Sequence, residues 1–284
     1  MTTPVPSVLI DGLIFPECPR WQQGKLWLSD MGGRQVLTVD AEGRSEVKAS
    51  VERPAGLGFL PDGRLLMVSE ADPFVRRLDP DGLHIVADLS SLGSVVLNDM
   101  VVDRQGRAYI GDDAFDMTAG TPPKPGRLIL VAPGGSGRVV AEGLGFPNGV
   151  VITPDDKTLI VAETMARCLT TFDVAADGSL SGRRLFADVG ASGLMPDGIC
   201  LDAEGAVWVA SVATGEFVRV AEGGGVTQRI PVPGKWAVAC MLGGQDRRTL
   251  FLCTAQTTPA DLAQGKSAGR IETARVEVPG AGLP

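Results

Sequence analysis

The stretch Pro147–Glu163, PNGVVITPDDKTLIVAE, contains the pattern that decides the fold. A turn made of Pro and Asp residues separates two apolar runs, and each run is short enough to be a β-strand. The pattern recurs in five further copies, which occupy residues 16–30, 54–70, 97–113, 196–211 and 237–254. The chain therefore repeats one two-strand unit six times.

Successive copies begin roughly 40 to 50 residues apart, which is the spacing of four-stranded propeller blades and is too long for leucine-rich or ankyrin repeats. Further strand-like runs follow the copies, as in residues 167–175 and 180–189. Helical periodicity is nearly absent. We expect an all-β fold, a six-bladed β-propeller with four-stranded blades, in which residues 1–284 form one domain.

A propeller has to close its ring, because unpaired first and last strands would expose edges that invite aggregation. The run SVLIDGLIF at residues 7–15 precedes the first copy, and RIETARVEV at residues 270–278 follows the last. The sequence predicts that these two segments pair within one blade.

Composition excludes several classes of partner. The formal net charge is −8 and the isoelectric point is near 4.8, whereas nucleic acids and anionic membranes are bound by basic faces. The N-terminus lacks a basic region, and no apolar run approaches the 18 or so residues of a membrane span. We expect a cytoplasmic protein that acts on a small molecule and binds neither nucleic acid nor membrane.

The five cysteines are odd in number, far apart and mostly within apolar runs. This pattern is typical of buried thiols in a reducing compartment. No Cys-x-x-Cys pair is present in the sequence, so structural zinc is not expected.

Four of the six copies carry an oxygen-bearing side chain near their start. Since the innermost strand of each blade runs along the central channel, equivalent positions form one ring around the axis. The ring positions are Glu17, Ala55, Asn98, Asn148, Asp197 and Val238. Two carboxylates and two amides facing one axis predict a site for a divalent cation.

The ligand types narrow the choice of ion. Carboxylate and amide oxygens without His or Cys suit a hard ion such as Ca²⁺ or Mg²⁺ better than zinc. Ca²⁺ is the first expectation, with Mg²⁺, Mn²⁺ and Zn²⁺ as alternatives. Pro-Asn-Gly and Pro-Asp-Gly are also ordinary turn sequences, but four such residues at equivalent axial positions favour a site.

A second group of polar residues lies where the second strand of each copy ends, at the same rim. These residues could surround the ion, line a pocket or begin solvated loops. They are Asp30, Glu70, Asp112, Asp113, Glu163, Ser211 and Thr254. We favour Asp112 and Asp113 as substrate-binding residues, because the insertion at residues 114–126 is long enough to fold over the channel. Trp236, near the same rim, either packs or lines an apolar part of the pocket.

Other chemistry is disfavoured. The only histidine, His84, lies in an alternating run expected in an outer strand, so neither a Ser-His-Asp nor a Cys-His mechanism is supported. The glycine-rich segments at residues 132–138 and 222–226 fall in hairpins and not before helices, which argues against phosphate loops.

With Phe15-PECPRW, Leu97-NDMVVD, Phe146-PNGV and Met195-PDGIC considered together, the chain resembles the SMP-30/gluconolactonase family. Members of this family, which includes the regucalcins, are six-bladed calcium-dependent hydrolases. The resemblance runs from about residue 8 to residue 278.

The resemblance implies that Glu17, Asn148 and Asp197 bind the metal and that Asn98 lies beside it, in contact with metal or substrate. It also implies that Asp197 is the acid/base group in lactone opening. Sugar-lactone members carry Arg-Phe-Asn-Asp where this chain has Val96-Leu97-Asn98-Asp99. This departure favours a lactone or ester that is less polar than a sugar lactone.

The sequence thus predicts a metal-dependent hydrolase that opens a lactone or related ester, with the cation polarising the carbonyl and Asp197 as general base or nucleophile. A phosphotriesterase or arylesterase using the same metal is one alternative. A calcium-binding propeller without catalysis is another.

Overall fold

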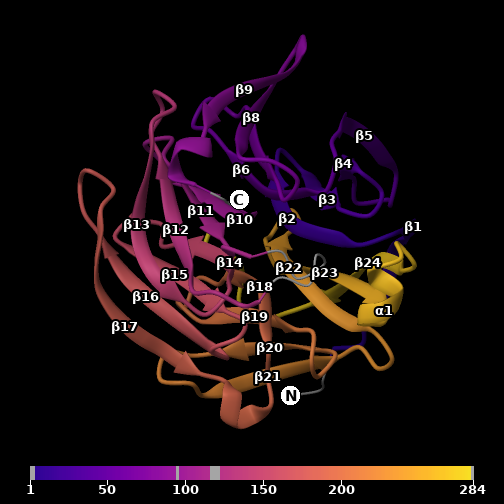
Figure 1. The fold of residues 1–284 in the computed structure, drawn as a ribbon. Helices are drawn as coiled ribbons and strands as arrows, with labels where there is room; N and C mark the ends of the chain where they lie inside the picture. The colour runs from indigo at the N-terminus through magenta and orange to yellow at the C-terminus, as the bar shows by residue number, and fades with distance from the viewer. Residues whose placement is uncertain (1–3, 94–95, 116–121, 283–284) are drawn as a thin grey trace.

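The computed structural model describes residues 4–93, 96–115 and 122–282. Its strands form six four-stranded antiparallel sheets arranged around a central axis, as Figure 1 shows. The predicted all-β, six-bladed propeller is confirmed. Helical structure in the described residues is limited to η1 (Ser90–Leu92), η2 (Gly190–Ser192) and α1 (Pro259–Leu262).

The first three blades follow the order of the chain from the axis outward. Blade 1 comprises β2 (Pro16–Gln22), β3 (Lys25–Asp30), β4 (Gln35–Val39) and β5 (Ser45–Ser50). Blade 2 comprises β6 (Pro54–Phe59), β7 (Leu65–Ser69), β8 (Phe74–Asp79) and β9 (Gly82–Asp88). Blade 3 comprises β10 (Leu97–Val102), β11 (Ala108–Asp112), β12 (Gly126–Val131) and β13 (Gly137–Leu144).

Blades 4 and 5 repeat this order, and blade 6 departs from it. Blade 4 comprises β14 (Pro147–Ile152), β15 (Thr158–Glu163), β16 (Cys168–Val174) and β17 (Leu180–Asp188). Blade 5 comprises β18 (Pro196–Leu201), β19 (Val207–Ser211), β20 (Glu216–Val220) and β21 (Val226–Pro231). Blade 6 comprises β22 (Trp236–Gly243), β23 (Thr249–Gln256), β24 (Ala268–Arg275) and β1 (Ser7–Leu13).

Blade 6 closes the ring. The N-terminal strand β1 is its outermost strand and pairs antiparallel with β24, with Ser7 opposite Thr273 and Leu13 opposite Gly269. The predicted pairing of the two ends of the chain is confirmed. The first strand of the chain thereby forms the outer edge of the last blade, and this pairing closes the ring.

The turn between the first and second strand of each blade explains the repeat in the sequence. At one equivalent position in each turn the residue has a positive φ, a conformation that glycine adopts without steric cost. Four turns use Gly24, Gly63, Gly106 and Gly205, and the other two use Asp156 and Arg247. Aspartates at these turns accept backbone N–H groups, as Asp103 does from Gln105 and Arg107. The turn residues therefore set the length of each inner hairpin.

The inner strands approach one another closely at the axis. A Cβ at Gly149 would lie 2.5 Å from the backbone nitrogen of Ile199, and one at Gly198 would lie 2.4 Å from the Cβ of Ala239. Glycine is needed at both positions, because any side chain would push neighbouring blades apart. The residues just before them, Asn148 and Asp197, are therefore held close together.

None of the helices in the described residues has the length and apolar character of a membrane span.

Candidate functional site

The predicted ring residues lie where the pairing of the inner strands is interrupted. In blades 2 to 5, two residues of the inner strand oppose a single residue of the second strand, and the ring residue is the first of the two. In blade 1 the irregularity falls just after Glu17, at Cys18, whose φ is 48°. Such bulges redirect side chains. Here they occur at the end of the channel that carries the polar residues.

The structure brings Glu17, Asn148 and Asp197 together. Both carboxyls are buried, with 9% of Glu17 and 6% of Asp197 exposed. Burial raises the pKa of Glu17 well above its usual value, and the negative charge of Asp197 adds to the effect. Burial likewise raises the pKa of Asp197 to about 8, although the neighbouring Asn148 side chain opposes the shift. These shifts mark two carboxyls whose negative charge is not compensated within the described residues.

Asn98 completes the group from blade 3. Its amide nitrogen lies 3.2 Å from Oδ2 of Asp113 and donates to it. Burial raises the pKa of Asp113 well above its usual value, with further contributions from the charges of Glu70 and Asp197. Asn98 and Asp113 thus form a hydrogen-bonded pair beside the Glu17–Asp197 group.

Asp112, predicted together with Asp113, has a different environment. Its side chain is fully buried. Oδ1 accepts hydrogen bonds from the N–H groups of Val96 and Ala114, and Oδ2 accepts a hydrogen bond from Nε of Arg127 at 2.6 Å. Both oxygens are therefore engaged by the protein. Asp112 fixes the segment before β10 and offers no oxygen to the channel, which separates its role from that of Asp113.

The role of Asp112 recurs in other blades. Asp30 accepts the N–H groups of Ile14 and Phe15, Glu163 accepts that of Gly145, and Ser211 accepts that of Met195. Each residue pairs with the first residue of its inner strand. The polar residues that end the second strands thus mainly support the chain that enters the ring. One position later in their blades, the charge of Glu70 raises the pKa of both axial carboxyls, and the pKa of Asp113 is itself raised by the charge of Asp197.

Trp236 begins β22 and is half-buried at the same rim. Its ring makes an edge-to-face contact with Phe15, with 6.4 Å between the ring centroids. Trp236 therefore packs against the segment that precedes Glu17. Six of the thirteen residues of the insertion expected to cover the channel, residues 116–121, lie outside the described residues.

A buried ion pair, Arg20 with Asp99, crosses between blades 1 and 3 and was not predicted from the sequence. Nη2 of Arg20 donates to Oδ1 of Asp99 at 2.6 Å and to the carbonyl of Met100 at 2.5 Å, and Nη1 donates to the carbonyl of Pro19. The side chains of Arg20 and Asp99 are 5% and 3% exposed. The only signal in the sequence is an arginine three residues after Glu17 and an aspartate directly after Asn98.

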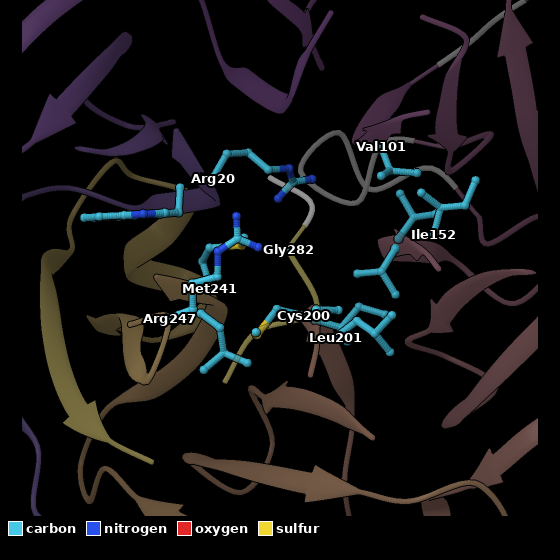
Figure 2. Close-up of a pocket in the computed structure, with 15 residues that line it drawn as sticks. Arg20, Val101, Ile152, Cys200, Leu201, Met241, Arg247 and Gly282 are labelled. Atoms are coloured by element: carbon cyan, nitrogen blue, oxygen red, sulfur yellow. The ribbon is translucent and has the colours of Figure 1, made fainter. Parts of the chain in front are cut away.

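The other end of the channel is narrow and largely apolar, and it contains a cavity of about 40 Å³. This volume has room for ordered water but not for a substrate. Figure 2 shows Arg20 extending into this cavity among apolar side chains. The lining includes Val101, Ile152, Leu201, Met241 and Arg247.

The C-terminal segment covers this end. Ala281 donates to the carbonyl of Leu201, and Gly280 donates to that of Arg247. The C-terminal segment therefore lies at the end of the channel opposite the predicted site.

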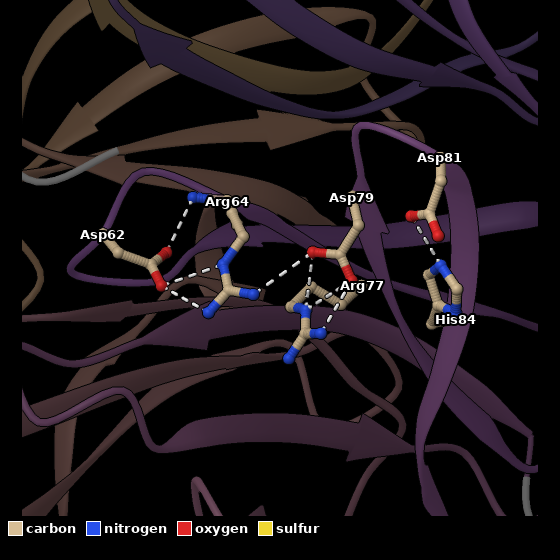
Figure 3. Close-up of polar contacts among 6 residues, drawn as sticks. All are labelled: Asp62, Arg64, Arg77, Asp79, Asp81 and His84. Atoms are coloured by element: carbon tan, nitrogen blue, oxygen red, sulfur yellow. Dashed lines mark hydrogen bonds and ion pairs between the residues drawn. The ribbon is translucent and has the colours of Figure 1, made fainter.

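A surface cluster in blade 2, formed by Asp79, Asp81 and His84, also places three potential metal ligands together. Figure 3 shows that its members already have partners. Asp79 accepts hydrogen bonds from Arg64 and Arg77, and Oδ1 of Asp81 accepts a hydrogen bond from Nε2 of His84 at 2.8 Å. Asp81 and His84 are exposed. The cluster is an ion-pair network on an outer hairpin, and the expected surface position of His84 is confirmed.

The axial group fits a divalent cation better. It offers the carboxylates of Glu17 and Asp197 with the amide oxygens of Asn98 and Asn148, which are hard ligands. Within residues 4–93, 96–115 and 122–282, neither carboxylate has an ion pair with Lys or Arg. Uncompensated buried charge is costly unless it is paired or coordinates a metal. A cation held here would remove that cost.

A six-bladed propeller with oxygen-bearing side chains at its axis fits two classes of protein, hydrolases and ion-binding proteins. Residues 15–256 match the family described as SMP-30/Gluconolactonase/LRE-like region. The chain belongs to this family, as its motifs predicted.

Two relatives are named as lactonases. The chain is 28% identical over 280 residues to pentonolactonase XacC of Haloferax volcanii, covering 94% of this chain and 92% of the relative. It is 25% identical over 285 residues to a 6-deoxy-6-sulfogluconolactonase of Pseudomonas putida, covering 95% and 94%. These matches confirm the predicted lactonase-type enzyme class.

A solved structure confirms the architecture. The calcium-binding protein regucalcin of Agrobacterium tumefaciens superimposes with a TM-score of 0.78 at 24% sequence identity, and the match covers 100% of both chains. At this identity, the likeness supports the propeller fold alone.

Proposed function

We propose that this protein is a metal-dependent lactonase that opens its substrate at the mouth of the central channel. The proposal rests mainly on Glu17 and Asp197, two carboxyls whose pKa values are raised by burial and which have no basic partner in the described part of the chain. Such an arrangement disfavours two free negative charges and favours a bound cation. The lactonase names of two relatives supply the reaction class.

In this proposal Glu17, Asn148 and Asp197 hold a divalent cation, with Ca²⁺ as the first expectation. The neutral amide of Asn148 adds an oxygen ligand without adding charge, so the set would carry a formal charge of about −2 that a divalent ion neutralises. When bound, the cation would act as a Lewis acid toward the substrate carbonyl. The calcium-binding description of the Agrobacterium regucalcin favours the same ion.

Asn98 and Asp113 would contact the substrate beside the ligands. Their mutual hydrogen bond fixes the orientation of the Asn98 amide, so that its oxygen can face the axis while its nitrogen binds Asp113. Asp112 supports this pair through the backbone of the segment before β10 and does not contact the substrate.

Asp197 is the residue proposed to act on the reacting atoms, as general base toward water or as nucleophile. Its burial and its position at the bulge of β18 keep the carboxylate at the axis. General-base assistance contributes about 10²- to 10⁴-fold to rate. The ester bond of the lactone would be cleaved and the hydroxy acid released.

For the substrate, we propose a lactone less polar than a sugar lactone. Val96 places an aliphatic, half-buried side chain just before β10, two residues before Asn98. An aliphatic side chain offers no hydrogen bonds to a polyhydroxylated ring and favours an apolar substituent. The two relatives are named for sugar acids, so this feature would separate the present chain from them.

The test measures metal content and hydrolysis with the same purified protein. We expect about one divalent cation per chain, hydrolysis of aliphatic lactones, and loss of both after chelation, with recovery on adding Ca²⁺. The panel includes sugar lactones, aryl esters and a phosphotriester. Activity that survives complete removal of metal would exclude the metal-dependent mechanism, and preference for sugar lactones would exclude the proposed substrate class.

A further inference from the structure

The buried pair of Arg20 and Asp99 has no part in the proposed chemistry, yet it joins the two sides of the site. Arg20 lies three residues after Glu17 on β2, and Asp99 directly follows Asn98 on β10. Their charged groups are 2.6 Å apart and nearly inaccessible to solvent. The ion pair therefore links blade 1 to blade 3.

Blade 2 leaves room for this link. Its inner strand, β6, carries three small residues, Ala55, Gly56 and Gly58. A Cβ at Gly56 would lie 2.6 Å from the carbonyl oxygen of Asn98 and 2.8 Å from the nitrogen of Met100. Blade 3 thus packs against the bare backbone of blade 2, and the long arginine of blade 1 can reach it.

The contacts of Arg20 are concentrated on the two irregular segments. One guanidinium nitrogen donates to the carbonyl of Pro19, inside the irregularity after Glu17. The other donates to Asp99 and to the carbonyl of Met100, and Oδ1 of Asp99 also accepts the N–H of Met100. The Arg20 side chain thereby holds both the backbone that orients Glu17 and the backbone that orients Asn98.

We propose that Arg20 and Asp99 are positioning residues that set the distance across the channel between Glu17 and Asn98 and so determine how tightly the site holds its cation. This inference rests on the proposed metal site. Neither residue contacts the ion or the reacting atoms. The pair also separates the two ends of the channel, because Arg20 lines the far cavity while Asp99 lies beside the ring.

The geometry predicts an effect on the cation that a purely structural pair would not have. Partners that orient metal ligands typically change metal affinity 10- to 100-fold when they are removed. By contrast, replacing both members of a buried ion pair with neutral residues of similar size is often neutral for stability. Stability and metal affinity should therefore separate in a suitable double variant.

The experiment compares Arg20→Met/Asp99→Asn with wild type by calorimetric titration of Ca²⁺ into metal-free protein, together with thermal unfolding. The carboxamide oxygen introduced by Asp99→Asn can still accept the N–H of Met100. We expect a folded protein whose Kd for Ca²⁺ is raised about 10- to 100-fold. Arg20→Lys, which keeps the charge but cannot maintain three directed contacts, should give a smaller increase and serves as a second variant should the double variant not fold.

The matched control is Arg107→Met/Asp103→Asn. This pair has the same 2.6 Å contact and similar burial but lies on the turn between β10 and β11, away from the ring. Its Kd for Ca²⁺ should equal that of wild type. An unchanged Kd in a folded Arg20 variant would overturn the inference while leaving the metal site intact. Failure of wild type to bind Ca²⁺, Mg²⁺, Mn²⁺ or Zn²⁺ would defeat the proposed function itself.

Discussion

On the axis of the channel, Glu17 and Asp197 are buried carboxyls without basic partners among the described residues, whereas other buried carboxylates, which support the fold, are paired with arginines. Asp99 with Arg20 and Asp202 with Arg219 illustrate the second arrangement. The same side-chain type is thus neutralised where it supports the fold and left uncompensated where we place the cation. Charge pairing, more than residue type, distinguishes the axial carboxyls from the carboxylates that support the fold.

The largest expected effect comes from removing the uncompensated carboxylates. Glu17→Gln and Asp197→Asn should each lower turnover by at least about 10³-fold, because the site loses a ligand and, for Asp197, the base as well. Steady-state assays on the best lactone of the panel measure this. The control is Asp81→Asn, which removes a carboxylate from the surface cluster of blade 2. A comparable loss in the control would place the functional metal outside the channel.

Adjacent aspartates provide the second contrast. Asp112→Ala should destabilise the protein by about 3–5 kcal/mol, because a buried ion pair is broken and two N–H groups lose their acceptor. Denaturant unfolding measures this difference. Asp113→Asn should instead leave stability nearly unchanged and lower kcat/KM about 10-fold or more. If both variants lost stability, or both kept it, the assignment of Asp112 to the support of the fold and of Asp113 to the site would be wrong.

A third prediction concerns the covered end of the channel. Deleting residues 278–284 removes three backbone hydrogen bonds, made by Ala203, Gly280 and Ala281. We expect a loss of about 1–3 kcal/mol in the free energy of unfolding. The affinity for Ca²⁺ should not change, since this segment lies opposite the mouth. Loss of metal binding on truncation would show that the two ends do not act separately.

The last prediction concerns a dependence of stability on pH in metal-free protein. The pKa of Asp197 rises from 3.8 to about 8 on folding. Its contribution to stability is complete below pH 4 and is lost as the pH rises toward 8. The melting temperature of metal-free protein should therefore fall between pH 5 and pH 8. Asp197→Asn should flatten this dependence, and Ca²⁺ should reverse it. A melting temperature that rises over this range in metal-free protein would contradict the burial of an uncompensated carboxyl.

The sequence predicts the fold because each blade carries the same local signals. Turn residues with positive φ recur at equivalent positions, and two of them, Asp156 and Arg247, are not glycine yet leave the pattern readable. The ring follows from the same repeat, because Glu17 and Asp197 occupy equivalent positions in two of its copies.

Contacts between blades are not visible in the repeat. Asp112 and Asp113 are neighbours in the sequence, but a side chain in a strand points opposite to the next one, and only the partners reveal which faces the channel. The pairing of Arg20 with Asp99 depends on small residues in a third blade. Such contacts join residues about eighty positions apart, so local patterns do not encode them.

The central claim is that the axial carboxylates hold a divalent cation, and calorimetric titration of Ca²⁺ into metal-free protein tests it most directly. We expect one site per chain in wild type and in Asp81→Asn, and no measurable binding in Asp197→Asn. Unchanged binding in Asp197→Asn, or loss of binding in Asp81→Asn alone, would contradict the claim.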